Sequence, residues 1–183
     1  MAKNNKLSII DELIYDILKS NVDNMPIRFT KLIANYYTDA RIRKLYWEKL
    51  GIKMGENTYA NLGLKLATAN NELSVYIGNN VSIAANVTFI TDSSANNGIE
   101  INKLEHVKEK LTKSANIIVE DEVWIGAGVI ILPGVNIGKC SVIGAGSVVT
   151  KNVDSYSVYA GSPAKKIRDL VTGKKVLEED YNG

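Results

Sequence analysis

An aliphatic residue recurs at every sixth position between residues 119 and 149, and this spacing constrains the fold more than any other feature of the chain. The positions are Val119, Ile125, Ile131, Ile137, Ile143 and Val149. A second apolar or small residue precedes each of the last five by two positions, as in a short strand with two inward side chains. Turn-forming residues, such as those at 126–128 and 144–146, follow these pairs, so the chain must bend after every short strand.

The same spacing extends towards the N-terminus and becomes weaker there. Apolar pairs stand at Val75 and Ile77, Val81 and Ile83, and Val87 and Phe89, and weaker matches stand at Leu64 and Leu66 and at Thr58 and Ala60. Counting three strands to a turn gives about four coils. One coil is too thin to bury its apolar row, but stacked coils share a continuous core and pair their backbones in parallel. The sequence therefore predicts an all-β main domain that is a parallel β-helix.

The regions outside the repeat predict helices and one long insertion. Apolar spacing indicates a helix at 9–20, and Thr38 can cap a further helix that stops at Gly51. The repeat lapses at 91–116, and a loop of that length in a compact domain is usually functional or disordered. Ser162-Pro163 is expected to open a short helix. We therefore predict a helical cap at 1–51, a β-helix at 52–161 with an inserted loop at 91–116, and a C-terminal helix and tail at 162–183.

Composition excludes several classes of protein. The formal net charge of +2 provides no basic field for nucleic-acid binding. A single cysteine excludes an intrachain disulfide framework, and one cysteine with one histidine cannot form a Cys/His zinc site. The N-terminus has no signal-peptide core, and the chain has no apolar run of 18 residues. We expect a cytoplasmic protein without a transmembrane segment.

Several motifs in the repeat region resemble those of the hexapeptide-repeat acetyltransferases, over about residues 52–168. The motifs are Asp121-Glu-Val-Trp-Ile-Gly126, Leu132-Pro-Gly-Val135, Ile143-Gly-Ala-Gly-Ser147, Val149-Thr-Lys151 and Ala160-Gly-Ser-Pro-Ala164. Within that family, the maltose, galactoside and capsular-polysaccharide O-acetyltransferases are the most similar. The resemblance implies a left-handed β-helix, acetyl-CoA as co-substrate, no metal, and a homotrimer with each active site between neighbouring subunits.

Transfer of acetyl from a thioester to an alcohol needs a base for the hydroxyl, a donor for the oxyanion, and positioning of both substrates. In the resembled family the base is a His followed by Pro, and an ungapped reading puts Ser94 and Ala95 there. The only histidine is His106, in the same long loop, and an imidazole suits proton transfer near neutrality. We therefore expect His106 to be the general base. The alternative is an exposed loop histidine, with another base or an inactive protein.

The resemblance also assigns binding residues. Tyr59 and Asn61 match acceptor-binding residues of that family. We also expect Asp92 and Ser94, on the inserted loop, to belong to the acceptor site. Asp92 can alternatively orient the imidazole, and Asn61 can simply form a turn. Trp124 occupies an outward position, which suggests a surface that becomes covered. The predicted acetyl-CoA site comprises Trp124, Ala127, Ala145, Thr150, Lys151, Lys165 and Arg168.

These expectations favour an acetyltransferase that moves acetyl from acetyl-CoA to a hydroxyl of a sugar or glycan. An amine acceptor, as in the amino-sugar and xenobiotic N-acetyltransferases of this fold, is an open alternative. A catalytically silent β-helix subunit is another, because the usual histidine motif is displaced. A zinc-dependent carbonic anhydrase on this fold would need three histidine ligands, and the chain has one histidine.

Overall fold

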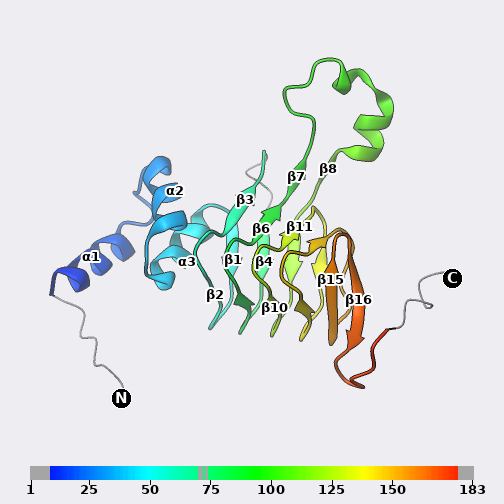
Figure 1. Cartoon of the computed structure of the whole chain (residues 1–183). Coiled ribbons are helices and arrows are strands. Elements are labelled where there is room, and N and C mark those ends of the chain that lie inside the picture. Colours follow the sequence, from blue (N-terminus) through cyan, green and yellow to red (C-terminus); the bar gives the residue numbers. More distant parts are fainter. Residues whose placement is uncertain (1–8, 70–71, 73, 177–183) are drawn as a thin grey trace.

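The computed structural model describes residues 9–69, 72 and 74–176, which form a coil of short strands closed at one end by helices (Figure 1). The strands of the coil are β1 (Ile52–Met54), β2 (Tyr59–Ala60), β3 (Lys65–Ala67), β4 (Val75–Ile77), β5 (Ser82–Ile83), β6 (Thr88–Ile90), β9 (Ile117–Val119), β10 (Trp124–Ile125), β11 (Ile130–Ile131), β12 (Asn136–Ile137), β13 (Val142–Ile143) and β14 (Val148–Val149). Consecutive strands fall in different sheets, so the chain winds around a common axis.

Three sheets form the sides of the coil. Sheet A has the strand order β1-β4-β9-β12, and sheet C has the order β3-β6-β11-β14. Sheet B has the order β2-β5-β10-β13-β15-β16. All pairs within the coil are parallel. The parallel β-helix expected from the sequence is therefore the observed architecture.

The core lies inside the three sheets and is built from the six-residue repeat. Val119, Ile125, Ile131, Ile137, Ile143 and Val149 are each at most 1% exposed. Because strand side chains alternate, the neighbouring residues point outward, and Trp124 beside Ile125 is 59% exposed. The repeat thus fixes which side chains form the core and which form the outer faces.

Three helices form the N-terminal cap: α1 (Ile9–Ser20), α2 (Ile27–Tyr36) and α3 (Ala40–Lys49). Figure 1 shows α3 next to the first strands of the coil. Tyr46 and Trp47 of α3 are buried in the same apolar cluster as the inward residues of the strands. The cap of α3 is Asp39, whose side chain accepts a hydrogen bond from the backbone N–H of Arg41, so the expectation that Thr38 caps this helix is wrong. Asp39 occupies the position from which a carboxylate reaches the second helical N–H. Among the described residues, no helix is long and apolar enough to cross a membrane.

The lapse in the repeat corresponds to a projecting insertion (Figure 1). Its stem is the antiparallel pair β7 (Asp92–Ser93) and β8 (Lys113–Ser114), and its tip contains the short helices η1 (Ile101–Lys103) and η2 (Val107–Leu111). The insertion connects β6 of sheet C to β9 of sheet A. It therefore leaves the coil at the edge where sheets A and C meet.

The expected C-terminal helix is wrong. The segment after Pro163 is strand β16 (Ala164–Asp169), which forms an antiparallel hairpin with β15 (Ser157–Gly161). Without β16, the last strand of sheet B would leave a row of unpaired backbone groups at the end of the coil. Pro163 follows a cis peptide bond in the hairpin turn, and proline is as typical of turns as of helix starts. The end of the predicted tail, 177–183, lies outside the described residues.

Candidate functional site

A row of outward side chains crosses sheet B and brings two of the predicted site residues together. Tyr59, Ser82 and Trp124 are consecutive partners in the parallel register of β2, β5 and β10. Adjacent strands are about 4.8 Å apart, so the two aromatic residues stand about 10 Å apart with a small serine between them. Tyr59 is 43% exposed and Trp124 is 59% exposed. This row forms an open slot with two aromatic walls.

The slot is part of a hollow of about 360 Å³. Its lining includes Asn57 and Asn61, which stand on either side of the strand that carries Tyr59. The backbone N–H of Asn61 donates to the carbonyl of Ile83 at 3.0 Å, which anchors this residue to the next coil. The structure thus places Tyr59, Asn61 and Trp124 in one hollow. Sequence reasoning missed Asn57 and Ser82, although the outward position of Ser82 on its strand is a signal for it.

Two cationic residues of α3 adjoin the same hollow. Arg43 is 5% exposed, and its guanidinium donates to the carbonyls of Tyr37, Thr38 and Ala60, each at 2.7 Å. Burial lowers the pKa of Arg43, while Asp39 acts in the opposite direction. Lys44 lies with Nζ 5.2 Å from the centroid of the Tyr59 ring and also donates to the carbonyl of Gly55. Sequence reasoning missed both residues, because a cation on a helix usually faces solvent.

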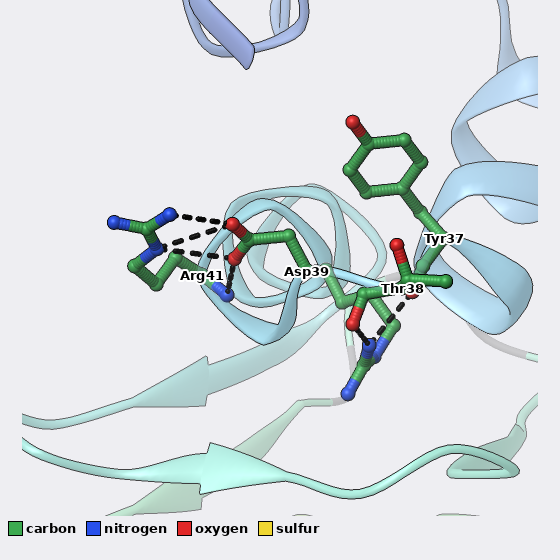
Figure 2. A network of polar contacts seen from close by, with 5 residues as sticks. Tyr37, Thr38, Asp39 and Arg41 are labelled. Carbon is green, nitrogen blue, oxygen red and sulfur yellow. Dashed lines mark hydrogen bonds and ion pairs between the residues drawn. The ribbon is translucent and has the colours of Figure 1, made fainter. Parts of the chain in front are cut away.

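The carboxylate nearest to Arg43 along the chain is already paired. The Asp39 carboxylate accepts a hydrogen bond of 2.6 Å from Nη2 of Arg41, and it also accepts from Nε of the same guanidinium. Figure 2 shows this network together with Tyr37 and Thr38. This hydrogen bonding to Arg41 lowers the pKa of Asp39 and raises the pKa of Arg41. Asp39 and Arg41 therefore form a closely paired unit, whereas the Arg43 guanidinium donates to three carbonyl oxygens.

The predicted donor residues Ala127 and Ala145 stack along the edge where sheets B and C meet. The N–H of Gly146 donates to the carbonyl of Ala127 at 2.8 Å, so the turns of successive coils are in direct contact. Both alanines are exposed. A Cβ added to Gly126 would lie 2.6 Å from the backbone nitrogen of Ala145, so this edge has no space for a larger residue there. Lys165 continues the edge, since it pairs with Ala160 in the terminal hairpin.

The other predicted donor residues lie elsewhere. Thr150 and Lys151 follow β14 of sheet C, shortly before the chain bridges to sheet A at Val153. Arg168 pairs with Val158 and donates to the carbonyl of Gly173 at 3.4 Å. One protomer therefore does not gather all the predicted donor residues at a single edge.

The predicted catalytic residues lie on the insertion. The hydroxyl of Ser94 donates to Asp92 at 3.2 Å, and the hydroxyl of Ser114 donates to the other oxygen of the same carboxylate. This arrangement ties the Asp92 side chain to the base of the insertion. His106 is exposed and precedes η2 at the tip. The insertion leaves at the edge between sheets A and C, opposite the face of sheet B that carries Trp124. In one protomer, His106 and the hollow thus lie on different sides of the coil.

In the part of the chain that the structure describes, no group of three His, Cys, Asp or Glu side chains is arranged to hold a metal ion. The candidate site is instead an aromatic slot with amide and hydroxyl groups, beside an edge of small residues. Such a surface suits an extended ligand on the edge and a polar ligand in the slot.

Comparison with known proteins places the repeat region in a defined class. Residues 116–151 match the Hexapep family, described as "Bacterial transferase hexapeptide (six repeats)". The galactoside O-acetyltransferase of Lactococcus lactis is 36% identical over 127 residues, which are 64% of this chain and 54% of that protein. This chain spans a little over half the length of that relative.

Solved structures give a consistent result. A galactoside acetyltransferase in complex with coenzyme A superposes with a TM-score of 0.61 at 28% identity, over 84% of this chain and 82% of that one. A hexapeptide-repeat acetyltransferase of Vibrio cholerae, complexed with acetyl coenzyme A, superposes with a TM-score of 0.61 at 26% identity, over 85% of this chain and 88% of that one.

Residues 116–151 of this chain therefore form a hexapeptide-repeat domain. Its homologues are galactoside O-acetyltransferases, and its structural neighbours are hexapeptide-repeat acetyltransferases. The resemblance recognised from the motifs is confirmed. The neighbours also imply that the β-helix is left-handed.

Proposed function

We propose that this chain is an acetyltransferase that uses acetyl-CoA and transfers the acetyl group to a hydroxyl of a sugar or glycan. The observation that carries the proposal is the hollow between Tyr59 and Trp124, which lies on the same sheet as the Ala127 and Ala145 turns. Homologues named galactoside O-acetyltransferases and a neighbour complexed with coenzyme A support the activity and the donor.

The acetyl-CoA site in this proposal runs along the edge of Ala127 and Ala145. Small side chains let a thin pantetheine arm approach the backbone closely. Trp124 lies on β10, the strand that leads into the turn with Ala127. Lys165 at the hairpin end of the edge provides a cation for the phosphates of the donor. Thr150 and Lys151 lie away from this edge in one protomer, and their role in donor binding requires a neighbouring subunit. Arg168 lies on sheet B, in the strand register of Val158, Val142 and Trp124.

The acceptor site in this proposal is the slot itself. An aromatic ring offers a stacking face to the apolar face of a sugar, and Tyr59 and Trp124 present two such faces. Asn61 carries both donor and acceptor groups for sugar hydroxyls. Asp92 and Ser94 belong to the acceptor site only if the insertion of a second subunit covers the slot.

The general base in this proposal is His106 of a neighbouring subunit. The insertion leaves the coil opposite the slot, so a single protomer cannot complete the site. A homotrimer with cyclic symmetry places the insertion of each subunit against the sheet B face of the next. The exposed position of His106 at the insertion tip suits this arrangement.

The chemistry is a direct transfer. The acceptor oxygen attacks the thioester carbonyl while the imidazole of His106 takes the hydroxyl proton. The carbon–sulfur bond then breaks, and the CoA thiolate leaves and takes up a proton. Because the thioester is already activated, the reaction needs no covalent enzyme intermediate.

The test measures release of the CoA thiol with a panel of sugars and amines. We expect thiol release with a sugar, and a decrease of about 100-fold or more in His106→Ala with CoA affinity unchanged. Lys108→Ala, on the same insertion, is the matched control and keeps the wild-type rate. Release with amines but not sugars would assign the N-acetyltransferase alternative, and CoA binding without release to either would indicate a silent subunit.

A further inference from the structure

The hollow on sheet B has an uneven charge distribution. None of the described residues that line it is a carboxylate. Its cap side instead adjoins two cations, Arg43 and Lys44, which follow each other on α3. A ligand in the hollow therefore meets positive charge on one side and neutral amide, hydroxyl and aromatic groups elsewhere.

The charge on Arg43 acts directly behind the lining of the hollow. Its Nη2 donates to the carbonyl of Ala60, and Ala60 itself lines the hollow. The three carbonyls that accept hydrogen bonds from Arg43 are neutral, and Asp39 is hydrogen-bonded to Arg41 instead. Asp39 acts on the charge of Arg43 only through space, without a hydrogen bond to it. In a buried, low-dielectric position such a charge extends its field further than a surface charge does.

Lys44 brings the second charge to the rim. Its ammonium lies 5.2 Å from the centroid of the Tyr59 ring and donates a hydrogen bond to the carbonyl of Gly55, and the Lys44 residue is half-buried. An ammonium has three N–H donors, and this bond uses one of them. A group that passes the edge of the Tyr59 ring towards α3 meets these donors.

We propose that the acceptor is an acidic sugar, whose carboxylate is directed towards Lys44 and Arg43 while its ring occupies the slot between Tyr59 and Trp124. This inference rests on the proposed function and specifies its substrate class. Lys44 is then a specificity-determining residue, because a neutral sugar of the same shape gains nothing from its charge.

The chain provides a matched control for Lys44. Lys53 Nζ lies 5.2 Å from the centroid of the Tyr76 ring, the same distance, but on the outer face of sheet A. Lys53→Gln therefore removes an equivalent lysine–tyrosine contact without touching the hollow. Lys44→Arg keeps the charge at the rim.

The test is a ligand-observed NMR titration of the full chain with galacturonic acid and with galactose, alongside thiol release with the same two sugars. Wild type should bind galacturonic acid at least about fivefold more tightly than galactose, and the preference should fall as salt rises. Lys44→Gln should reduce the preference about threefold or more, whereas Lys53→Gln and Lys44→Arg keep it.

The inference is overturned if galactose binds as tightly as galacturonic acid, or if Lys44→Gln weakens both sugars equally. The second result would show that Lys44 only positions the Tyr59 ring and does not select for an acidic sugar. A preference for galacturonic acid without any thiol release would contradict the proposed acetyltransferase activity but would support the proposed binding of an acidic sugar. The two proposals therefore fail separately.

Discussion

Arg43 donates a hydrogen bond of 2.7 Å from its Nη2 to the carbonyl oxygen of Ala60, 17 residues further along the chain. Ala60 lies between Tyr59 and Asn61, so this bond connects the helical cap to the segment that carries these two proposed acceptor residues. The other guanidinium nitrogen holds the carbonyls of Tyr37 and Thr38 at the end of α2. One buried side chain thus joins α2, α3 and the first coil.

Removal of this guanidinium should destabilise the protein strongly. Arg43→Met leaves three carbonyls without their donor in a buried position, and we expect a loss of about 2–4 kcal/mol in the free energy of unfolding. Urea unfolding measures this change. Arg41→Met is the control, because Arg41 is exposed and its ion pair with Asp39 is at the surface, and it should cost less than about 1 kcal/mol. Equal losses in the two variants would contradict a structural role for Arg43.

Any side chain at Gly126, on the edge between sheets B and C, should destabilise the protein. An added Cβ would lie 2.6 Å from the nitrogen and 2.9 Å from the Cα of Ala145, both backbone atoms. Gly126→Ala should therefore cost about 2 kcal/mol or more and weaken CoA binding. A Cβ added to Gly128 has no atom within 4 Å, so Gly128→Ala should cost only the strain of its positive φ of 69°, about 1–2 kcal/mol. CoA binding should be retained in this variant. Thermal unfolding and CoA titration separate the two variants, and unchanged CoA binding in Gly126→Ala would argue against the donor edge.

The Asp39 carboxylate should make stability depend on pH in the acid range. Hydrogen bonding to Arg41 lowers the pKa of Asp39 in the folded state. Its contribution is therefore complete above the unfolded value, about 3.9, and is lost as pH falls through the lower folded value. Asp39→Asn removes the charge and keeps a good helix cap. The stability difference between wild type and this variant should be present at pH 7 and vanish in strong acid; a difference that does not change with pH would contradict this account.

The six-residue repeat should dominate the stability of the coil. Ile131 is fully buried, and Ile131→Ala should cost about 2–5 kcal/mol of unfolding free energy. Ile99 on the insertion is 76% exposed, and Ile99→Ala should change stability by less than about 0.5 kcal/mol. Urea unfolding of both variants tests whether the repeat positions form the core.

The core was predictable because strand alternation and turn spacing are local properties. Once Ile125 is inward, its neighbour Trp124 must be outward, and the coil period then aligns it with Ser82 and Tyr59. The grouping of Tyr59, Asn61 and Trp124 follows from that register. For these residues, the motif resemblance and the strand geometry lead to the same site.

The errors of sequence reasoning have non-local causes. The segment after Pro163 is charged and has few apolar residues, and the edge of sheet B decides that it is a strand. Arg43 could not be recognised, because its three carbonyl partners meet only when α2, α3 and β2 are assembled. The position of His106 relative to the hollow is also non-local, because the edge at which its loop leaves the coil is a property of the sheet order.

The most direct test of the account is activity after mixing two variants that it expects to be nearly inactive: His106→Ala, which lacks the proposed base, and Trp124→Ala, which lacks one wall of the proposed slot. If each site combines the insertion of one subunit with the sheet B face of the next, both residues are intact at about a quarter of the interfaces in randomly mixed trimers. We expect thiol release at about a quarter of the wild-type rate after unfolding and refolding the variants together, although each variant alone is inactive. No recovery of activity in mixed trimers would contradict a site shared between neighbouring subunits.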